Sequence, residues 1–278
     1  MKKLRKISKY YYVRQIVACW LIFCMLVIMP ARVAMAIETP LPDALPDGII
    51  DSIGINTPVI DNINDIMDIT QTASEAIVNW NTFDIGSDAT VNFLQPGTDA
   101  AVLNRVHDGN ITGIMGTLNA NGGVYIVNPA GIVFGSGSTV NVTQLVASSL
   151  EIEDGDFLDG MPYTFTGGVE TGNVTNQGTI TAETIALIGK HVINTGALSA
   201  EGGLVIMAAG DTVLISETGG TVAVDVAIPD LALTSDYLVD HQAGTIDAEN
   251  VILAAGDIWS SAMTVSYTHL TLPTTPYV

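Results

Sequence analysis

Short apolar runs separated by turn residues dominate the sequence from about residue 77 onward. Residues 124–127 and 132–134, for example, are apolar and lie on either side of the break 128–131. Gly, Asn and Asp recur between such runs, and no helical period of apolar residues persists over a useful length. Strands that alternate with turn residues at short spacing predict an all-β architecture.

Three segments of the chain repeat one pattern. Residues 176–182 (NQGTITA), 194–200 (NTGALSA) and 242–248 (QAGTIDA) are each followed by a strongly apolar stretch, and Gly178 and Gly196 are 18 residues apart. A unit this short cannot bury its apolar face alone. Copies stacked along an axis share one core, with successive coils about 4.8 Å apart. The repeats therefore predict a parallel β-helix, a solenoid of stacked coils.

The first 36 residues have the pattern of a secretory signal peptide. A basic start precedes the apolar run 16–29, and Ala34 and Ala36 supply the small residues that a signal peptidase requires. The apolar run is shorter than the roughly 20 residues of a membrane span, so an uncleaved anchor is the weaker alternative. Residues 37–70, rich in proline, aspartate and asparagine, are expected to form an acidic leader before a β-helical domain of residues 71–264.

Charge and cysteine content change sharply once residues 1–36 are removed. Seven of the nine basic residues and both cysteines lie in that segment, whereas all 29 acidic residues follow it. The remaining chain then contains two basic residues, Arg105 and Lys190, and 29 acidic residues, which gives a formal charge of −27. Such a charge disfavours nucleic acid and anionic lipid as partners. An exported chain without disulfides must also take its stability from its core.

Candidate catalytic and metal-binding residues form no recognised motif. His107, His191, His241 and His269 lie far apart, and no serine lies in a G-x-S-x-G motif. The acidic segment 151–160 lacks the ligand spacing of a calcium loop. We therefore expect no enzyme activity, metal or cofactor. A carbohydrate-active β-helix enzyme stays open as an alternative, because a glycosidase needs only two carboxylates.

The break Asn128-Pro129-Ala130-Gly131 fits a type I β-turn. Asparagine at the first position accepts a hydrogen bond from the backbone two residues on, and proline presets φ at the second. Alanine suits the third position of a type I turn but not of a type II turn, which requires positive φ there. On this interpretation the motif stabilises a corner of a coil. Direct contact with another protein is the alternative.

A succession of motifs resembles a known family. The segments IVNWNTFDIGSDATVNFLQP, AVLNRV, GTLNANGGVYIVNPAGIVFG, VNVTQLVASSLEI and NQGTITA are similar, in this order, to the amino-terminal secretion domain of filamentous haemagglutinin-type exoproteins. These are the exported partners of two-partner secretion systems in Gram-negative bacteria. The resemblance covers residues 76–257 and implies a right-handed parallel β-helix with an amino-terminal cap. It also implies export through the periplasm to the cell surface or the medium.

The resemblance also implies a transport partner and two sequence motifs. The partner is an outer-membrane β-barrel transporter that recognises the domain through periplasmic POTRA domains. The motifs, both rich in asparagine, match Asn119-Ala120-Asn121-Gly122 and Asn128-Pro129-Ala130-Gly131, where Ala130 replaces the usual asparagine. The domain would direct transport of a longer adhesin-type exoprotein and template its folding, while a downstream region would bind a host or cell-surface carbohydrate or protein. A self-sufficient surface-binding protein is the remaining alternative.

The last residues depart from the repeat pattern. Segment 265–278 (VSYTHLTLPTTPYV) has no acidic residue and no repeat. Two interpretations stay open, a translated foreign sequence or an irregular native terminus.

Overall fold

The computed structural model describes residues 39–168, 171–218, 221–228, 237–241, 244–256 and 263–265. The chain divides into two units, Met1–Ile37 and Glu38–Val278, and the described residues all belong to the second. The predicted signal peptide, with Ala34 and Ala36, and residues 266–278 of the predicted tail lie outside the described residues. No helix in the described part of the chain is long and apolar enough to cross a membrane.

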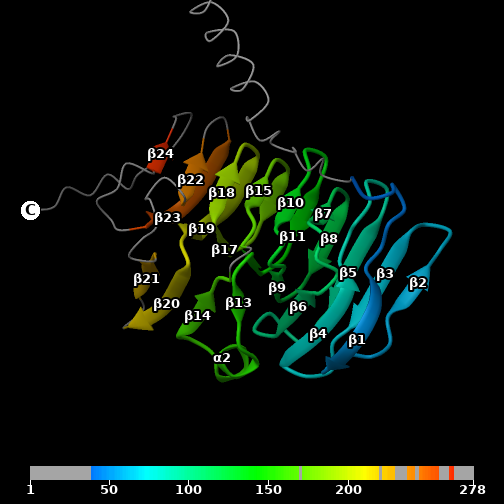
Figure 1. The fold of residues 1–278 in the computed structure, drawn as a ribbon. Coiled ribbons are helices and arrows are strands. Elements are labelled where there is room, and N and C mark those ends of the chain that lie inside the picture. Colours follow the sequence, from blue (N-terminus) through cyan, green and yellow to red (C-terminus); the bar gives the residue numbers. More distant parts are fainter. Residues whose placement is uncertain are drawn as a thin grey trace, which may run out of the picture. The chain divides into compact units, whose positions relative to one another are not determined.

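Parallel strands stack in successive coils and form three faces (Figure 1). This confirms the predicted parallel β-helix. The first face contains β4 (Glu75–Thr82), β6 (Ala101–Val106), β9 (Gly123–Val127), β12 (Gln144–Ser148), β17 (Thr184–Gly189) and the second halves of β19 (Ala197–Ala209) and β23 (Thr245–Ala255). The second face contains β3 (Ile66–Thr70), β5 (Thr90–Leu94), β8 (Thr117–Ala120), β11 (Thr139–Asn141), β16 (Thr179–Thr181) and the first halves of β19 and β23.

The third face is a separate parallel sheet. It contains β7 (Thr112–Ile114), β10 (Ile132–Phe134), β15 (Val174–Asn176), β18 (His191–Asn194), β22 (Leu238–His241) and β24 (Met263–Val265). The described residues of the three repeated segments occupy equivalent places in successive coils. Thr179 of β16 pairs with Ala197 of β19, which pairs with Thr245 of β23. The predicted 18-residue spacing therefore corresponds to one turn of the helix.

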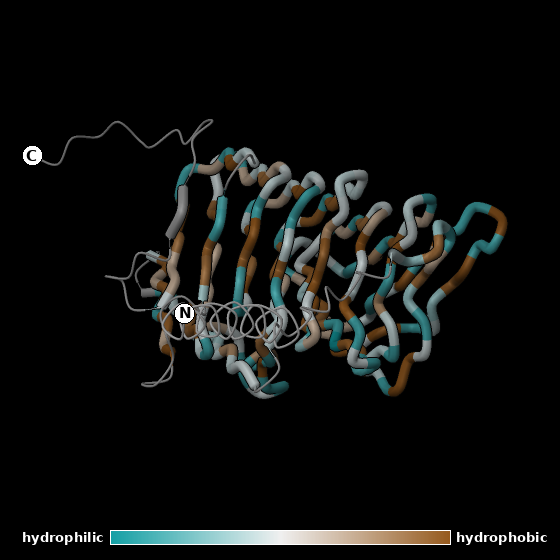
Figure 2. Tube along the Cα trace, turned by 45° about the horizontal axis from the view of Figure 1, so that its top comes forward, coloured by the Kyte–Doolittle hydropathy of each residue, from teal (hydrophilic) through white to brown (hydrophobic). Residues whose placement is uncertain are grey.

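Columns of apolar side chains in register fill the interior. On the second face, for example, Val91, Leu118, Val140, Ile180 and Leu198 occupy one column and are all buried. Figure 2 shows these apolar segments recurring at similar places from coil to coil. The residues that flank these positions on the same strands point outward, and most of them are polar. This face therefore shows the period-2 alternation of a half-buried sheet.

The central strands of the first face are buried on both sides, because an outer layer covers them. That layer is an antiparallel sheet of β13 (Glu151–Ile152), β14 (Tyr163–Thr166), β20 (Thr212–Thr218) and β21 (Thr221–Ala227), with the short helix α2 (Asp154–Asp159). Tyr125 of β9 packs edge-on against Phe157 of α2 and Tyr163 of β14. Double burial explains why strands of the first face read as continuous apolar runs rather than alternating ones.

Antiparallel strands close the amino-terminal end of the stack. β1 (Asp47–Ile53) pairs with β4, and β2 (Val59–Asp61) pairs with β3. The expectation of an extended leader over residues 37–70 is therefore wrong from residue 47 onward. The strand β3 even contributes Met67 and Ile69 to the core. These antiparallel strands are the amino-terminal cap that the family resemblance implied.

Candidate functional site

The first asparagine motif lies at the corner between β8 and β9. Asn119, on the outer side of β8, donates from Nδ2 to Asn92 Oδ1 of the preceding coil at 3.0 Å. Asn141 of the next coil donates to Asn119 Oδ1 at 3.4 Å. Asn92 in turn donates to Asp68 at 2.9 Å. Asn119 is therefore one step of an amide ladder that runs along the outside of the second face.

Asn121 holds the corner of the preceding coil at two points. Its Oδ1 accepts a hydrogen bond from the backbone N–H of Gln95 at 2.8 Å, and its Nδ2 donates to the carbonyl oxygen of Gln95 at 2.9 Å. Gly122 follows because the coils approach closely here: a Cβ atom would lie 2.4 Å from the carbonyl oxygen of Ala100. In the motif N-A-N-G, Asn121 thus hydrogen-bonds the preceding coil, and Gly122 allows the two coils to approach closely.

Two buried glutamines, which were not predicted from the sequence, form hydrogen bonds on the inner side of this corner. Gln95 donates from Nε2 to Gln71 Oε1 at 2.9 Å, and both side chains are buried. Gln71 donates from its own amide to the carbonyl oxygens of Ala73 and Ala101, at 2.7 and 2.9 Å. Their spacing of 24 residues, one coil in this part of the chain, is the signal that could have identified them.

The second asparagine motif forms the predicted turn between β9 and β10. The N–H of Gly131 donates to the carbonyl oxygen of Asn128 at 2.9 Å, and the N–H of Ala130 donates to Asn128 Oδ1 at 2.9 Å. Among the described non-glycine residues only Asp65 has positive φ, so Ala130 has the negative φ that a type I turn requires. These are the hydrogen bonds of a type I turn whose first residue also accepts through its side chain.

The side chain of Asn128 is buried and makes hydrogen bonds within the chain through both its nitrogen and its oxygen. Only 1% of the residue is exposed. Its Nδ2 donates to the carbonyl oxygen of Asn110 and to Thr112 Oγ1, each at 2.8 Å, in the preceding coil. With the bond from Ala130, the amide uses both donors and one acceptor. Asn128 therefore joins its turn to the coil before it.

Pro129 and Gly131 join the same turn to the following coil. The carbonyl oxygen of Pro129 accepts a hydrogen bond from the N–H of Gly172 at 2.8 Å. Gly131 has φ of +119°, and a Cβ atom there would lie 2.8 Å from the carbonyl oxygen of Asn173. Glycine is needed both for the backbone conformation and for the close approach.

The two motifs flank β9 and act at different corners. The first holds the corner between the second and first faces, and the second holds the corner between the first and third. No hydrogen bond between described residues joins one motif to the other. Both motifs lie in the same coil, and both fix the stacking of that coil on its neighbours.

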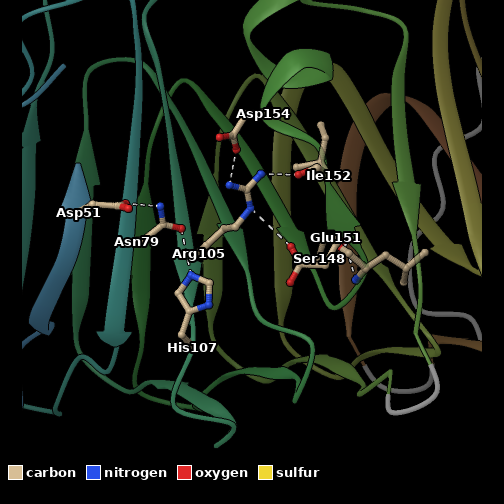
Figure 3. Close-up of polar contacts among 9 residues, drawn as sticks. Asp51, Asn79, Arg105, His107, Ser148, Glu151, Ile152 and Asp154 are labelled. Atoms are coloured by element: carbon tan, nitrogen blue, oxygen red, sulfur yellow. Dashed lines mark hydrogen bonds and ion pairs between the residues drawn. The ribbon is translucent and has the colours of Figure 1, made fainter. Parts of the chain in front are cut away.

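Arg105, noted in the sequence only as a rare cation, connects the outer layer to the β-helix (Figure 3). Its guanidinium on β6 donates to the Asp154 carboxylate and to the carbonyl oxygen of Ile152, and Nε lies 3.5 Å from Glu151. Burial raises the pKa of the Glu151 carboxyl, while the positive charges of Arg105 and His107 oppose that rise. Figure 3 also shows Asn79 between Asp51 and His107.

A groove lies between β21 and the last coils. It has a volume of about 740 Å³ and is lined in part by Glu183, Glu201, Leu204, Val222 and Ile252. No His, Lys or Arg lines it. Within the described part of the chain, no cluster of three or more His, Cys, Asp or Glu side chains is placed to hold a metal ion.

Comparison with known proteins places this fold among secretion domains. The structure is similar to the HMW1 secretion domain from Haemophilus influenzae, with a TM-score of 0.63 and 26% identity over 75% of this chain and 57% of that one. It also resembles in fold the filamentous hemagglutinin secretion domain, with a TM-score of 0.55 and 15% identity over 79% of this chain and 80% of that one. The class is therefore a β-helical secretion domain.

Sequence comparison gives the family. The model of the TPS (two-partner secretion) secretion domain matches residues 49–269, so the chain belongs to this family. A heme/hemopexin-binding protein of Haemophilus influenzae strain Rd is 31% identical over 227 residues, which are 78% of this chain and 24% of that protein. A second heme/hemopexin-binding protein of Haemophilus influenzae is 42% identical over 89 residues, 32% of this chain and 10% of that protein. The chain thus spans about a quarter of the longer match.

Proposed function

We propose that the domain acts in the periplasm as the element that its transporter's POTRA domains recognise. As a TPS secretion domain, it works with a cognate transporter and is secreted through the periplasm. The sequence supports the entry step, since residues 1–36 have the pattern of a signal peptide and Ala34 and Ala36 mark the cleavage site. The finished exoprotein would then reach the cell surface or the medium.

The asparagine motifs support secretion through folding rather than by direct contact with the transporter. The observation that carries this proposal is the environment of Asn128, whose side chain is 1% exposed and bonded to Asn110, Thr112 and Ala130. A side chain with no free surface offers a partner nothing to recognise. Ala130, where the family usually has asparagine, leaves the turn intact, because its N–H rather than its side chain makes the bond.

The domain would also template the folding of the chain that follows it. β23 stacks on β19 in register, and its Val251 and Leu253 continue the columns of Val205 and Met207. Strands at the end of such a stack present a ladder of backbone groups ready for pairing. A following coil would pair with β23 and bury these side chains. Binding to a host or cell-surface carbohydrate or protein would belong to that later region.

The test compares secretion with stability in matched variants. Asn128→Ala and Pro129→Ala are expected to lower the amount of domain in the medium and the midpoint of unfolding together. A variant that unfolds at the wild-type midpoint yet fails to bind the purified POTRA domains would contradict the folding role and assign direct contact instead. Asn119→Ala, in the solvent-facing ladder, serves as the control and should change both quantities less.

A further inference from the structure

Three buried side chains form a hydrogen-bonded ladder at the corner after the third face. Asn176, Asn194 and His241 are the last residues of β15, β18 and β22 and lie in register. Their exposed fractions are 0%, 0% and 3%. Asn176 Nδ2 is 2.9 Å from Asn194 Oδ1, and Asn194 Nδ2 is 3.0 Å from His241 Nδ1. One polar side chain from each of three successive coils is thus joined to the next.

The backbone sets the direction of this ladder. The N–H of Gly178 donates to Asn176 Oδ1 at 3.1 Å, and because a backbone N–H only donates, Asn176 is left to donate from Nδ2. Asn194 then accepts through Oδ1 and donates from Nδ2 to His241. His241 must therefore accept at Nδ1, which requires a neutral ring. A protonated ring would place two N–H donors face to face.

The surroundings of the ring favour its neutral form. Burial lowers the pKa of His241, and the hydrogen bond to the Asn194 backbone and the charge of Asp240 oppose this without reversing it. His191 lies on the neighbouring strand β18, three positions before Asn194. The other titratable groups on strands packed against β22 are exposed, namely Glu201 of β19 and Asp247 and Glu249 of β23. The described residues of β24 contribute none.

We propose that Asn176, Asn194 and His241 form a pH-sensitive latch, which holds the coil of β22 and β23 on the coil before it. With a neutral ring the latch is complete; on protonation His241 loses its acceptor and the coil is released. The latch sets the pH range in which the coil of β22 and β23 is ordered enough to receive a following coil, a role that rests on the proposed templating but goes beyond transport itself.

The sign of the pH dependence follows from the lowered pKa. The unfolded chain binds a proton at His241 more readily than the folded chain, near the ordinary histidine value of about 6.5. The stabilisation from the latch is therefore fully present above that pH. It is lost as the pH falls from there through the lower pKa of the folded state.

The matched variant for this latch is His241→Asn. Asparagine extends the ladder with an amide oxygen that accepts a hydrogen bond at any pH and does not titrate. Hydrogen exchange of the mature chain would be measured at about pH 7.5 and about pH 5, after correction for the intrinsic pH dependence of exchange. His107→Asn, which changes an exposed histidine on another face, is the control.

The wild-type chain should lose roughly tenfold in protection over β22 and β23 at the lower pH, relative to β9 and β12. The His107→Asn variant should behave in the same way, whereas His241→Asn should lose less than about twofold. Equal losses in wild type and His241→Asn, or no loss in wild type, would overturn the proposal. If His241→Asn does not fold, an NMR titration of the wild-type imidazoles decides, since a His241 pKa above the ordinary value overturns the latch.

Discussion

Replacing Asn128 by alanine tests how the second asparagine motif works. The change removes three hydrogen bonds, to the Asn110 carbonyl oxygen at 2.8 Å, to Thr112 Oγ1 at 2.8 Å and from the Ala130 N–H at 2.9 Å. Each such bond contributes about 0.5–1.5 kcal/mol, and groups left buried without a partner add to the loss. We expect the free energy of unfolding to fall by about 3 kcal/mol.

Urea unfolding of the chain without residues 1–36, followed by far-ultraviolet circular dichroism, measures this loss. Asn119→Ala is the matched control, because Asn119 is partly exposed and its ladder partners keep contact with water. It should cost about 1 kcal/mol or less. Asn128→Asp gives a second check, since it keeps the acceptor for Ala130 but loses both donors. A cost below about 0.5 kcal/mol for Asn128→Ala would refute the structural role assigned to this amide.

Three further changes test other contacts. Gly131→Ala should cost about 1–3 kcal/mol in urea unfolding, because it strains a positive φ and meets the carbonyl oxygen of Asn173, whereas Gly109→Ala, with positive φ but open space, should cost less. Arg105→Met should loosen the outer layer from the β-helix, because it removes the bonds to Asp154 and Ile152. We expect the free energy of unfolding to fall by about 1–2 kcal/mol and hydrogen exchange over α2 and β14 to become faster. Unchanged exchange over α2 and β14 would contradict this role of Arg105. Burial raises the pKa of Asp84, so its ionisation lowers the stability of the fold as the pH rises above the pKa of aspartate in the unfolded chain. Asp84→Asn should therefore raise the urea midpoint of unfolding at neutral pH but not near pH 3. An equal rise of the midpoint at the two pH values would contradict this.

The repeat spacing made most of the β-helix predictable from sequence. Gly178 and Gly196 marked one coil, because every short coil needs a close-packed corner at the same place. The turn at residues 128–131 was also predictable, since asparagine, proline and glycine each have a defined place in a type I turn. These are local signals, and the coils of a solenoid depend mainly on their neighbours.

Features that depend on distant residues were not predictable in this way. The outer layer pairs β14 with β20, segments almost 50 residues apart, and local patterning carries no signal for that pairing. Residues of the cap were predicted to belong to an acidic leader because the segment 37–70 is rich in proline, aspartate and asparagine. Asp61 instead accepts a hydrogen bond from the N–H of Ile63 in the turn between β2 and β3, while Met67 and Ile69 alternate inward from a strand only five residues long.

Secretion by the cognate transporter tests the central claim most directly. The full chain, with residues 1–36, would be expressed in a Gram-negative host with and without that transporter, and the domain would be assayed in the medium and in the periplasm. The account predicts intact domain in the medium only when the transporter is present, and a reduced amount for Asn128→Ala. Intact, folded wild-type domain that stays in the periplasm beside a functional transporter would contradict it.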